Sequence, residues 1–291
     1  MINTNLNHLP EDKQANIRSI VDVIHDEFDQ VVGVATKEAK QRSRIVLILL
    51  FGSYAKGTYV NDPENGYISD YDILVVLNEP ELVDEYKIWH TVEERTALKT
   101  GAPVNVIVHT LREVNQELKQ GHYFFKDIRE QAIQLYQYNH TELLNPGLLV
   151  REEARHIAQN HFEHWFGSAN GFFKQYQHAM DDKEFKIAAF LLHQAVERYF
   201  SCLLLVHTNY RPKSHNIKML HSLGLQHFEA LKDIFPQNSK FNRRCFQLLK
   251  KAYIEARYSE HYSITADELA WLAGETEKLK GMTKVLCEAR I

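Results

Sequence analysis

Two strand-like segments, separated by a polar stretch that contains glycines, constrain the fold of this chain more than any other feature. The first, Arg44 to Phe51, is a continuous apolar run of the kind that forms a strand buried on both faces. The second, Ser69 to Leu77, carries Asp70 and Asp72. Because side chains two positions apart on a strand point to the same face, we expect these two carboxylates to lie together.

The rest of the first half alternates helical and strand patterns. Helical periodicity covers 12–31 and 79–99, and strand patterns cover 103–110 and 133–136, with two short helical stretches between these two strands. This alternation predicts a small unit of helices around a mixed sheet.

After Pro146 the strand patterns stop. Helical periodicity then covers five segments, 148–180, 184–208, 214–232, 238–260 and 265–289. Thr265, followed three positions later by Glu268, forms the capping box that marks a helix start. Five helices with short loops predict a bundle. We therefore expect an α+β protein with two domains, residues 1–145 and 146–291.

Composition favours a soluble cytoplasmic protein. The 291 residues carry a formal net charge of −4, which gives no overall attraction to nucleic acid. Three cysteines, odd in number and without metal-ligand spacing, fit a reducing compartment. The amino terminus is polar and shows no signal-peptide core. The longest uninterrupted apolar run, Ile45 to Phe51, is much shorter than the roughly 20 residues of a membrane helix, so no membrane partner is expected.

The residues around the two aspartates suit the transfer of a phosphate-containing group. Proteins bind Mg²⁺ through one or two carboxylates together with phosphate oxygens of the substrate, and Asp70 and Asp72 could play that part. Gly52 allows the backbone to approach a phosphate, and Ser53 offers a hydroxyl and an amide. An ordinary turn beside two solvated aspartates is the alternative, which the combined spacing makes the weaker interpretation. The expected substrate-binding positions are Gly52, Ser53, Lys56, Gly57 and Asn105.

The order Gly52-Ser53, Gly57 and Asp70-x-Asp72 resembles the nucleotidyltransferase fold of the DNA polymerase β superfamily, in particular its minimal bacterial members. The resemblance spans about residues 30–140. It implies a small mixed sheet, Mg²⁺ held by the two aspartates, and phosphate held at the Gly-Ser pair. It also implies transfer of a nucleoside monophosphate, in the first instance AMP from ATP, to a hydroxyl of a protein or small molecule.

One position departs from that family pattern. The third acid, which usually lies on the next inward strand, is replaced by Asn105. The carbonyl of its amide can ligate weakly or hold a water, but the side chain cannot act as a base or carry charge. General-base help typically contributes about 10²–10⁴-fold. Three outcomes remain open: weak transfer, use of His109 as the base, or nucleotide binding without transfer. A structural role is the simpler interpretation of His109.

The helical half resembles the HEPN domain family, small helical bundles that are often paired or fused with minimal nucleotidyltransferases. The resemblance spans about residues 148–289. It rests on an apolar helix that carries Glu197, then Tyr210 to His215, then Ile217 and Leu220. A buried carboxylate such as Glu197 needs a partner.

Many HEPN domains cleave RNA without a metal, using an arginine and a histidine separated by four to six residues. Arg257 and His261 are the candidate catalytic pair, expected on one helix face, with Arg257 stabilising phosphate and His261 moving a proton. Only three residues separate them, one fewer than the family spacing, and an ordinary charged helix face is the alternative. The resemblance also implies a homodimer and, as in related two-protein systems, adenylylation of a nearby tyrosine, here Tyr258 or Tyr262.

Three functions therefore remain open. The first is a Mg²⁺-dependent nucleotidyltransferase with the helical domain as its partner or acceptor module. The second is a HEPN ribonuclease, acting as a toxin on RNA and regulated by its own nucleotidyltransferase domain as in toxin–antitoxin systems. The third is a nucleotide-binding regulatory protein with little or no catalysis, which Asn105 and the short Arg257–His261 spacing favour.

Overall fold

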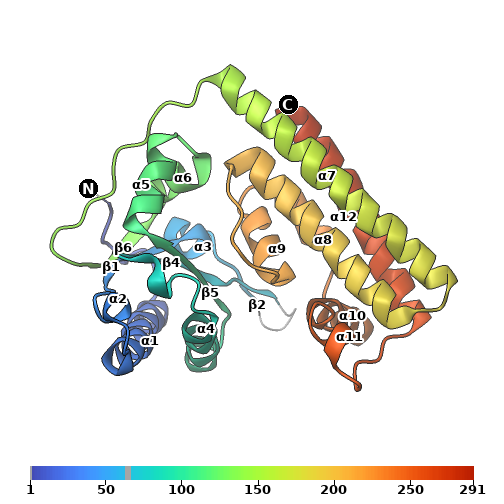
Figure 1. Ribbon diagram of the computed structural model, residues 1–291, viewed down its shortest axis with the longest axis horizontal. Helices are drawn as coiled ribbons and strands as arrows, with labels where there is room; N and C mark the ends of the chain where they lie inside the picture. Colours follow the sequence, from blue (N-terminus) through green and yellow to red (C-terminus); the bar gives the residue numbers. More distant parts are fainter. Residues whose placement is uncertain (1, 63–66) are drawn as a thin grey trace. The chain divides into compact units, whose positions relative to one another are not determined.

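The computed structural model describes residues 2–62 and 67–291, and the chain forms two compact units (Figure 1). The first unit ends at Leu149, and the second runs from Val150 to Ile291. Residues 63–66, part of the polar loop expected before Ser69, lie outside the described residues.

A four-stranded mixed sheet forms the centre of the first unit. Its strands, in the order β5-β4-β1-β6, are β5 (Val104–Thr110), β4 (Tyr71–Leu77), β1 (Ile45–Phe51) and β6 (Ile133–Gln137). β1 runs antiparallel to β4 and β6, whereas β4 and β5 are parallel. Every residue of β1 and β4 is buried, which explains their continuous apolar sequences. The mixed sheet confirms the predicted α+β class.

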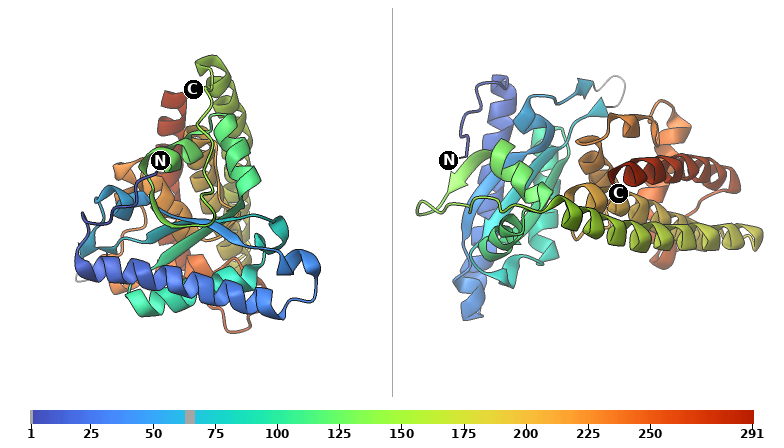
Figure 2. Two further views of the ribbon diagram at one scale, coloured as in Figure 1. Left: turned by 90° about the vertical axis from the view of Figure 1, so that its left-hand side faces the viewer. Right: turned by 90° about the horizontal axis from the view of Figure 1, so that it is seen from above.

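Helices cover both faces of this sheet, as the views in Figure 2 show. α1 and α4 pack on one face, where Ile20 and Ile24 of α1 and Val92 of α4 meet Ile73 and Val75 of β4. α5 and α6 lie over the other face. These helices are α1 (Glu11–Val34), α4 (Tyr86–Thr100), α5 (Leu111–Lys119) and α6 (Tyr123–Gln131). The smaller elements are α2 (Glu38–Gln41), α3 (Gly52–Lys56), β2 (Asn61–Asp62), β3 (Tyr67–Ile68) and the 3₁₀ turn η1 (Pro80–Leu82).

The second unit is a helical bundle centred on α8, which packs against α7, α9 and α12. The expected capping box at the start of α12 is present, since Thr265 accepts the Glu268 N–H and Glu268 accepts the Thr265 N–H. The helices are α7 (Arg151–Asp181), α8 (Phe185–Thr208), α9 (Ile217–Leu225), α10 (Lys240–Lys251), α11 (Glu255–Tyr258) and α12 (Ala266–Arg290), with a 3₁₀ turn η2 (Glu229–Asp233).

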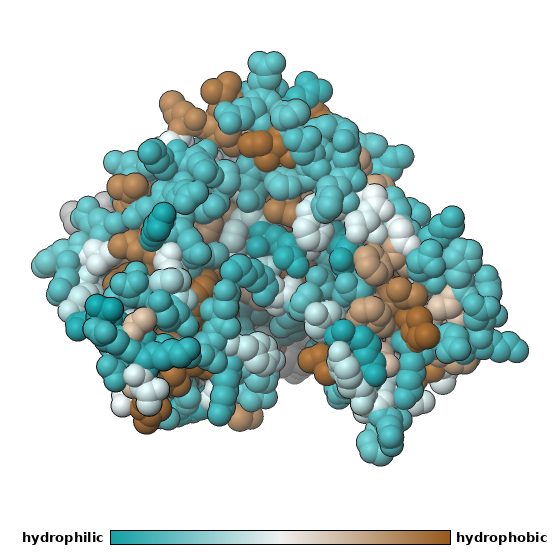
Figure 3. All heavy atoms as spheres, viewed as in Figure 1, coloured by the Kyte–Doolittle hydropathy of each residue, from teal (hydrophilic) through white to brown (hydrophobic). Residues whose placement is uncertain are grey.

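By length and composition α8 is apolar enough to cross a membrane. The longest uninterrupted apolar run did not reveal it, because polar residues such as His193 and Glu197 interrupt the helix. However, 78% of its most apolar window is buried inside the protein. Its apolar surface is therefore accounted for by packing in the bundle. The face of the molecule in Figure 3 is mainly hydrophilic, with apolar residues in separate small patches.

Two of the five segments that were predicted to be single helices are divided in the structure, so these two predictions are wrong. The segment 214–232 breaks after α9, because the chain folds back at Gly224, where an added Cβ would lie only 2.8 Å from a side-chain carbon of Leu231. The segment 238–260 breaks into α10 and α11 around Tyr253. The ring of Tyr253 packs against Phe190 and His193 of α8, and a turn brings it there.

Candidate functional site

The two predicted aspartates converge with Asn105 where β4 and β5 begin. Asp72 pairs with Asn105 across the parallel strands, and Asp70 lies immediately before β4. The Asn105 amino group donates to Asp72 Oδ1 at 2.9 Å and to Asp70 Oδ2 at 3.3 Å. One side-chain amide therefore bridges both carboxylates.

This cluster is almost completely buried, with Asp70 4%, Asp72 1% and Asn105 5% exposed. Two neighbouring carboxylates repel each other, and buried charges are costly unless they are hydrogen-bonded and paired. A hydrogen bond to a charged group contributes about 1.5–3 kcal/mol. Asn105 therefore stabilises the pair without supplying any charge. Its amino group, and not the carbonyl considered from the sequence, faces the carboxylates.

The Gly-Ser turn reaches the same place through β1. Phe51, the last residue of β1, pairs with Asp72, so Gly52 and Ser53 follow directly beside it. Gly52 has a φ of +74°, in the left-handed region that favours glycine. This conformation lets the strand turn at once into α3 and keeps Ser53 next to the acidic cluster.

Tyrosine rings anchor α3 to β4. Tyr54 of α3 stacks between Tyr59 and Tyr71, with ring centroids 4.5 and 3.9 Å apart. Burial raises the pKa of Tyr54, so its hydroxyl stays neutral. At the end of the helix, Lys56 is exposed, and Gly57 closes α3 in the left-handed conformation with a φ of +72°. Gly57 thus has a conformational role, and the Lys56 side chain is accessible.

The donors fit a divalent cation in kind, since carboxylate oxygens are ligands that Mg²⁺ prefers. The set is small: within residues 2–62 and 67–291 no group of three or more His, Cys, Asp or Glu side chains converges in a metal-binding arrangement. A cation at this cluster would therefore depend on Asp70, Asp72 and oxygens of its substrate.

Glu93 is a neighbour of the cluster that the sequence did not single out. Its Oε1 accepts the backbone N–H of Val106, the residue after Asn105, at 3.0 Å. Burial raises the pKa of Glu93 to about 7, the Val106 N–H opposes this rise, and the charge of Asp70 adds to it. A glutamate on an amphipathic helix carries no local pattern that would identify it.

His109 lies away from the cluster. It is four residues beyond Asn105 on β5, about 13 Å along the strand. Its Nδ1 lies 3.3 Å from Glu113 Oε2, and its ring contacts the Phe125 ring edge to face. Glu113 also caps the start of α5. Packing and helix capping therefore account for His109.

In the second unit, the expectation that Arg257 and His261 share a helix face is wrong. α11 ends at Tyr258, and the chain continues without helix to the start of α12. Lys186 of α8 donates to the backbone oxygens of Ser259 and Glu260, at 3.0 and 3.3 Å, which holds this segment out of the helix.

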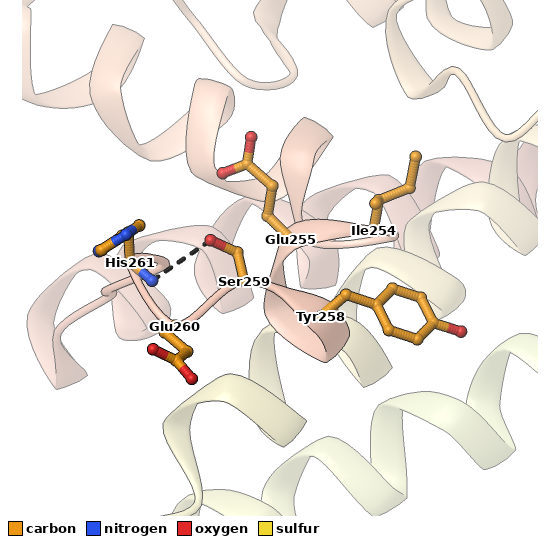
Figure 4. Close-up of a pocket in the computed structure, with 6 residues that line it drawn as sticks. All are labelled: Ile254, Glu255, Tyr258, Ser259, Glu260 and His261. Atoms are coloured by element: carbon orange, nitrogen blue, oxygen red, sulfur yellow. Dashed lines mark hydrogen bonds between the residues drawn. The ribbon is translucent and has the colours of Figure 1, made fainter.

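The two side chains consequently have different surroundings. The Arg257 guanidinium lies over the rings of Tyr253 and Phe190, 4.5 and 4.8 Å from their centroids. His261 instead lines a pocket with Glu255, Ser259 and their neighbours (Figure 4), and its backbone N–H donates to Ser259 Oγ at 3.3 Å. The catalytic roles of Arg257 and His261 stay predictions.

The two candidate acceptor tyrosines differ in accessibility. Tyr258 is 75% exposed and points away from His261 in Figure 4. Tyr262 is 3% exposed, and its hydroxyl donates to the backbone oxygen of Leu248 at 3.0 Å. Burial also raises the pKa of Tyr262. Only Tyr258 of this pair presents its hydroxyl to solvent.

Glu197, the unexpected carboxylate on α8, is buried in a network of partners. Its Oε1 binds Arg211 Nη2 at 3.2 Å, and its Oε2 accepts from Gln194 at 3.2 Å and from His215 Nδ1 at 3.0 Å. The Tyr253 hydroxyl lies 2.9 Å from the other ring nitrogen of His215. The segment after α8 thus supplies the partners that the carboxylate required.

Comparison with known proteins assigns both halves. A nucleotidyltransferase domain model matches residues 35–135, and a HEPN domain model matches residues 162–285. A protein of Methanocaldococcus jannaschii named "Putative protein adenylyltransferase" is 34% identical over 100 residues, which cover 34% of this chain and 86% of that protein. Both resemblances stated from the sequence are confirmed. The chain belongs to the nucleotidyltransferase family, carries a HEPN domain in its C-terminal half, and is a transferase.

Proposed function

We propose that this protein transfers AMP from ATP, with Mg²⁺, to a hydroxyl group of a protein. The acceptor oxygen bonds to the α phosphorus, the bond from that phosphorus to the α–β bridging oxygen breaks, pyrophosphate leaves, and the hydroxyl proton passes to solvent. The observation that carries this proposal is the buried cluster of Asp70, Asp72 and Asn105 directly beside Gly52 and Ser53. The name of the archaeal relative supports adenylyl as the transferred group and protein as the acceptor.

Two of these residues would supply negative charge, and two would position the triphosphate. Asp70 and Asp72 would hold the cation, because they are buried carboxylates that lie together on the Asn105 amino group. Bound Mg²⁺ supplies positive charge that polarises the phosphoryl oxygens. Gly52 and Ser53 would bind the triphosphate with backbone amides and the Ser53 hydroxyl, since the turn places them next to Asp72.

The absence of an acid at Asn105 bears on the acceptor. An amide cannot take the proton of the attacking hydroxyl, and His109 is about 13 Å along the strand. A phenol, with a pKa of about 10, gives up its proton far more readily than an aliphatic alcohol. Tyrosine is therefore the acceptor that this site can best use, and Tyr258 is an accessible example in the chain itself.

Transfer is tested with two labels. Wild type and Asp70→Ala/Asp72→Ala are incubated with Mg²⁺ and ATP labelled on either the α or the γ phosphate. We expect protein to gain the α label and not the γ label, and the double variant to gain neither. Asp26→Asn, an exposed acid on α1, is the matched control and should retain transfer. Transfer of the γ label, or no binding of any nucleotide, would contradict the proposal.

The acceptor is then located by mass spectrometry. We expect a mass increase of one AMP on the 257–262 peptide, lost in Tyr258→Phe and kept in Tyr262→Phe. An unmodified 257–262 peptide in protein that has gained label elsewhere rejects Tyr258 and leaves nucleotidyl transfer intact.

A further inference from the structure

We propose that Asn105 makes the acidic cluster a site for one divalent cation, by excluding the second ion that a two-metal transfer site holds. The inference rests on the proposed function, because it concerns the cation of that same site. It changes the expected chemistry, since one ion has to serve a displacement that two-metal enzymes divide between two.

The geometry comes first. The Asn105 amino group lies within hydrogen-bond distance of both carboxylates, 2.9 Å from Asp72 Oδ1 and 3.3 Å from Asp70 Oδ2. The pairing of Asp72 with Asn105 in the parallel ladder fixes this arrangement, and all three side chains are at most 5% exposed. One oxygen of each carboxylate therefore faces an N–H donor.

The negative charge available at the cluster is the second argument for a single cation. Two metal ions about 3.5–4 Å apart carry four positive charges and need several anionic oxygens between and around them. Asp70 and Asp72 supply two negative charges, and the described residues hold no cluster of three metal-binding side chains. On the side where a third acid would face both aspartates, the chain places N–H groups, which cannot bind a cation.

The amide is also held in this orientation. Turning it over would replace two hydrogen bonds by contact between a carbonyl oxygen and two carboxylates, in a site almost closed to water. Glu93 does not take the place of the missing acid, because among the described residues it does not form a metal-binding group of three with Asp70 and Asp72. Its Oε1 accepts the Val106 N–H.

The number of bound ions is measured directly with Mn²⁺ by electron paramagnetic resonance, in the presence of an ATP analogue with a non-cleavable α–β bridge. For wild type we expect one Mn²⁺ per chain with the six-line spectrum of an isolated ion. Asn105→Asp restores the third acid and should bind two ions per chain with a spin-coupled spectrum. Gln116→Glu, which adds a carboxylate at an exposed position of α5, is the matched control and should bind one.

Each outcome decides the matter. A spin-coupled pair in wild type overturns the inference, and so does a single ion in a folded Asn105→Asp variant, with folding checked by circular dichroism. If Asn105→Asp does not fold, the wild-type count alone decides between one ion and two. No bound Mn²⁺ in wild type overturns both this inference and the Mg²⁺ dependence of the proposed function, whereas two coupled ions leave the proposed function standing.

Discussion

The two units bury acidic side chains in opposite ways. In the first unit, Asp70 and Asp72 share the amino group of Asn105, a neutral partner that adds no charge. In the second, Glu197 binds the cationic Arg211 and the ring of His215. The amide adds no positive charge to the first cluster, whereas Arg211 adds a cation to the second. Under the proposed function, the first cluster binds a cation, whereas the second is a polar network within the bundle.

The largest effect is expected at the first cluster. Asp72→Asn should reduce AMP transfer by about 10³-fold, because the removed charge accounts for several kcal/mol of cation-mediated transition-state stabilisation. The free energy of unfolding should stay the same or rise, since one of two neighbouring buried charges disappears. Transfer of α-labelled ATP and urea unfolding measure the two quantities. The exposed Asp26→Asn change should alter neither quantity. A large loss of stability in Asp72→Asn would contradict the comparison, because the first cluster would then stabilise its unit as the second cluster does.

The reverse result is expected at the second cluster. Glu197→Ala should lower the free energy of unfolding by about 3–5 kcal/mol, because it leaves Arg211 without its buried partner. Urea unfolding followed by the fluorescence of Trp165 and Trp271, both in the second unit, measures the loss. Glu163→Ala, at an exposed position of α7, provides the baseline. A loss below about 1 kcal/mol would show that the network is not structural.

The units should also respond to pH in opposite directions. Burial raises the pKa of Glu93 to about 7 from 4.5, so the folded first unit binds a proton that the unfolded chain releases, and stability falls as pH rises from 4.5 to 7. Burial lowers the pKa of His193 to about 4 from 6.5, so stability of the second unit is present above pH 6.5 and is lost as pH falls toward 4.

Substitution isolates each contribution. When the pH is raised from 4.5 to 8, the free energy of unfolding of Glu93→Gln should rise by about 3 kcal/mol relative to that of wild type. When the pH is lowered from 8 to 4, the free energy of unfolding of His193→Gln should rise by a similar amount relative to that of wild type. Trp89 reports on the first unit once Trp165 and Trp271 are changed to Phe. If the free energy of unfolding of wild type and of a variant changed with pH in parallel, the substituted residue would not be the source of the pH dependence.

The smallest effect concerns the two tyrosines. Tyr262→Phe should cost about 1 kcal/mol, because the Leu248 carbonyl loses its hydrogen bond in a buried place. Tyr258→Phe should change stability by less than about 0.5 kcal/mol, since its side chain is 75% exposed. Equal costs in urea unfolding would contradict the difference in burial on which the choice of Tyr258 as acceptor depends.

Much of the fold could be predicted from local pattern. The continuous apolar run of β1 and the alternation that places Asp70 and Asp72 on one face are properties of a few neighbouring residues. The capping box at Thr265 is local in the same way. Periodicity failed where the chain turns: after α9, where Gly224 lies close to Leu231, and at Tyr253, whose ring packs against α8.

The sequence by itself determined which residue types the candidate site contains: two aspartates, a Gly-Ser turn and an amide in place of an acid. Only the tertiary structure decided that Asn105 turns its amino group to both carboxylates, that Glu93 lies beside them, and that Arg257 and His261 separate. The physical reason is distance along the chain. Asn105 lies 33 and 35 residues from its partners, so strand register and packing fix its contacts, and local propensity carries no record of either.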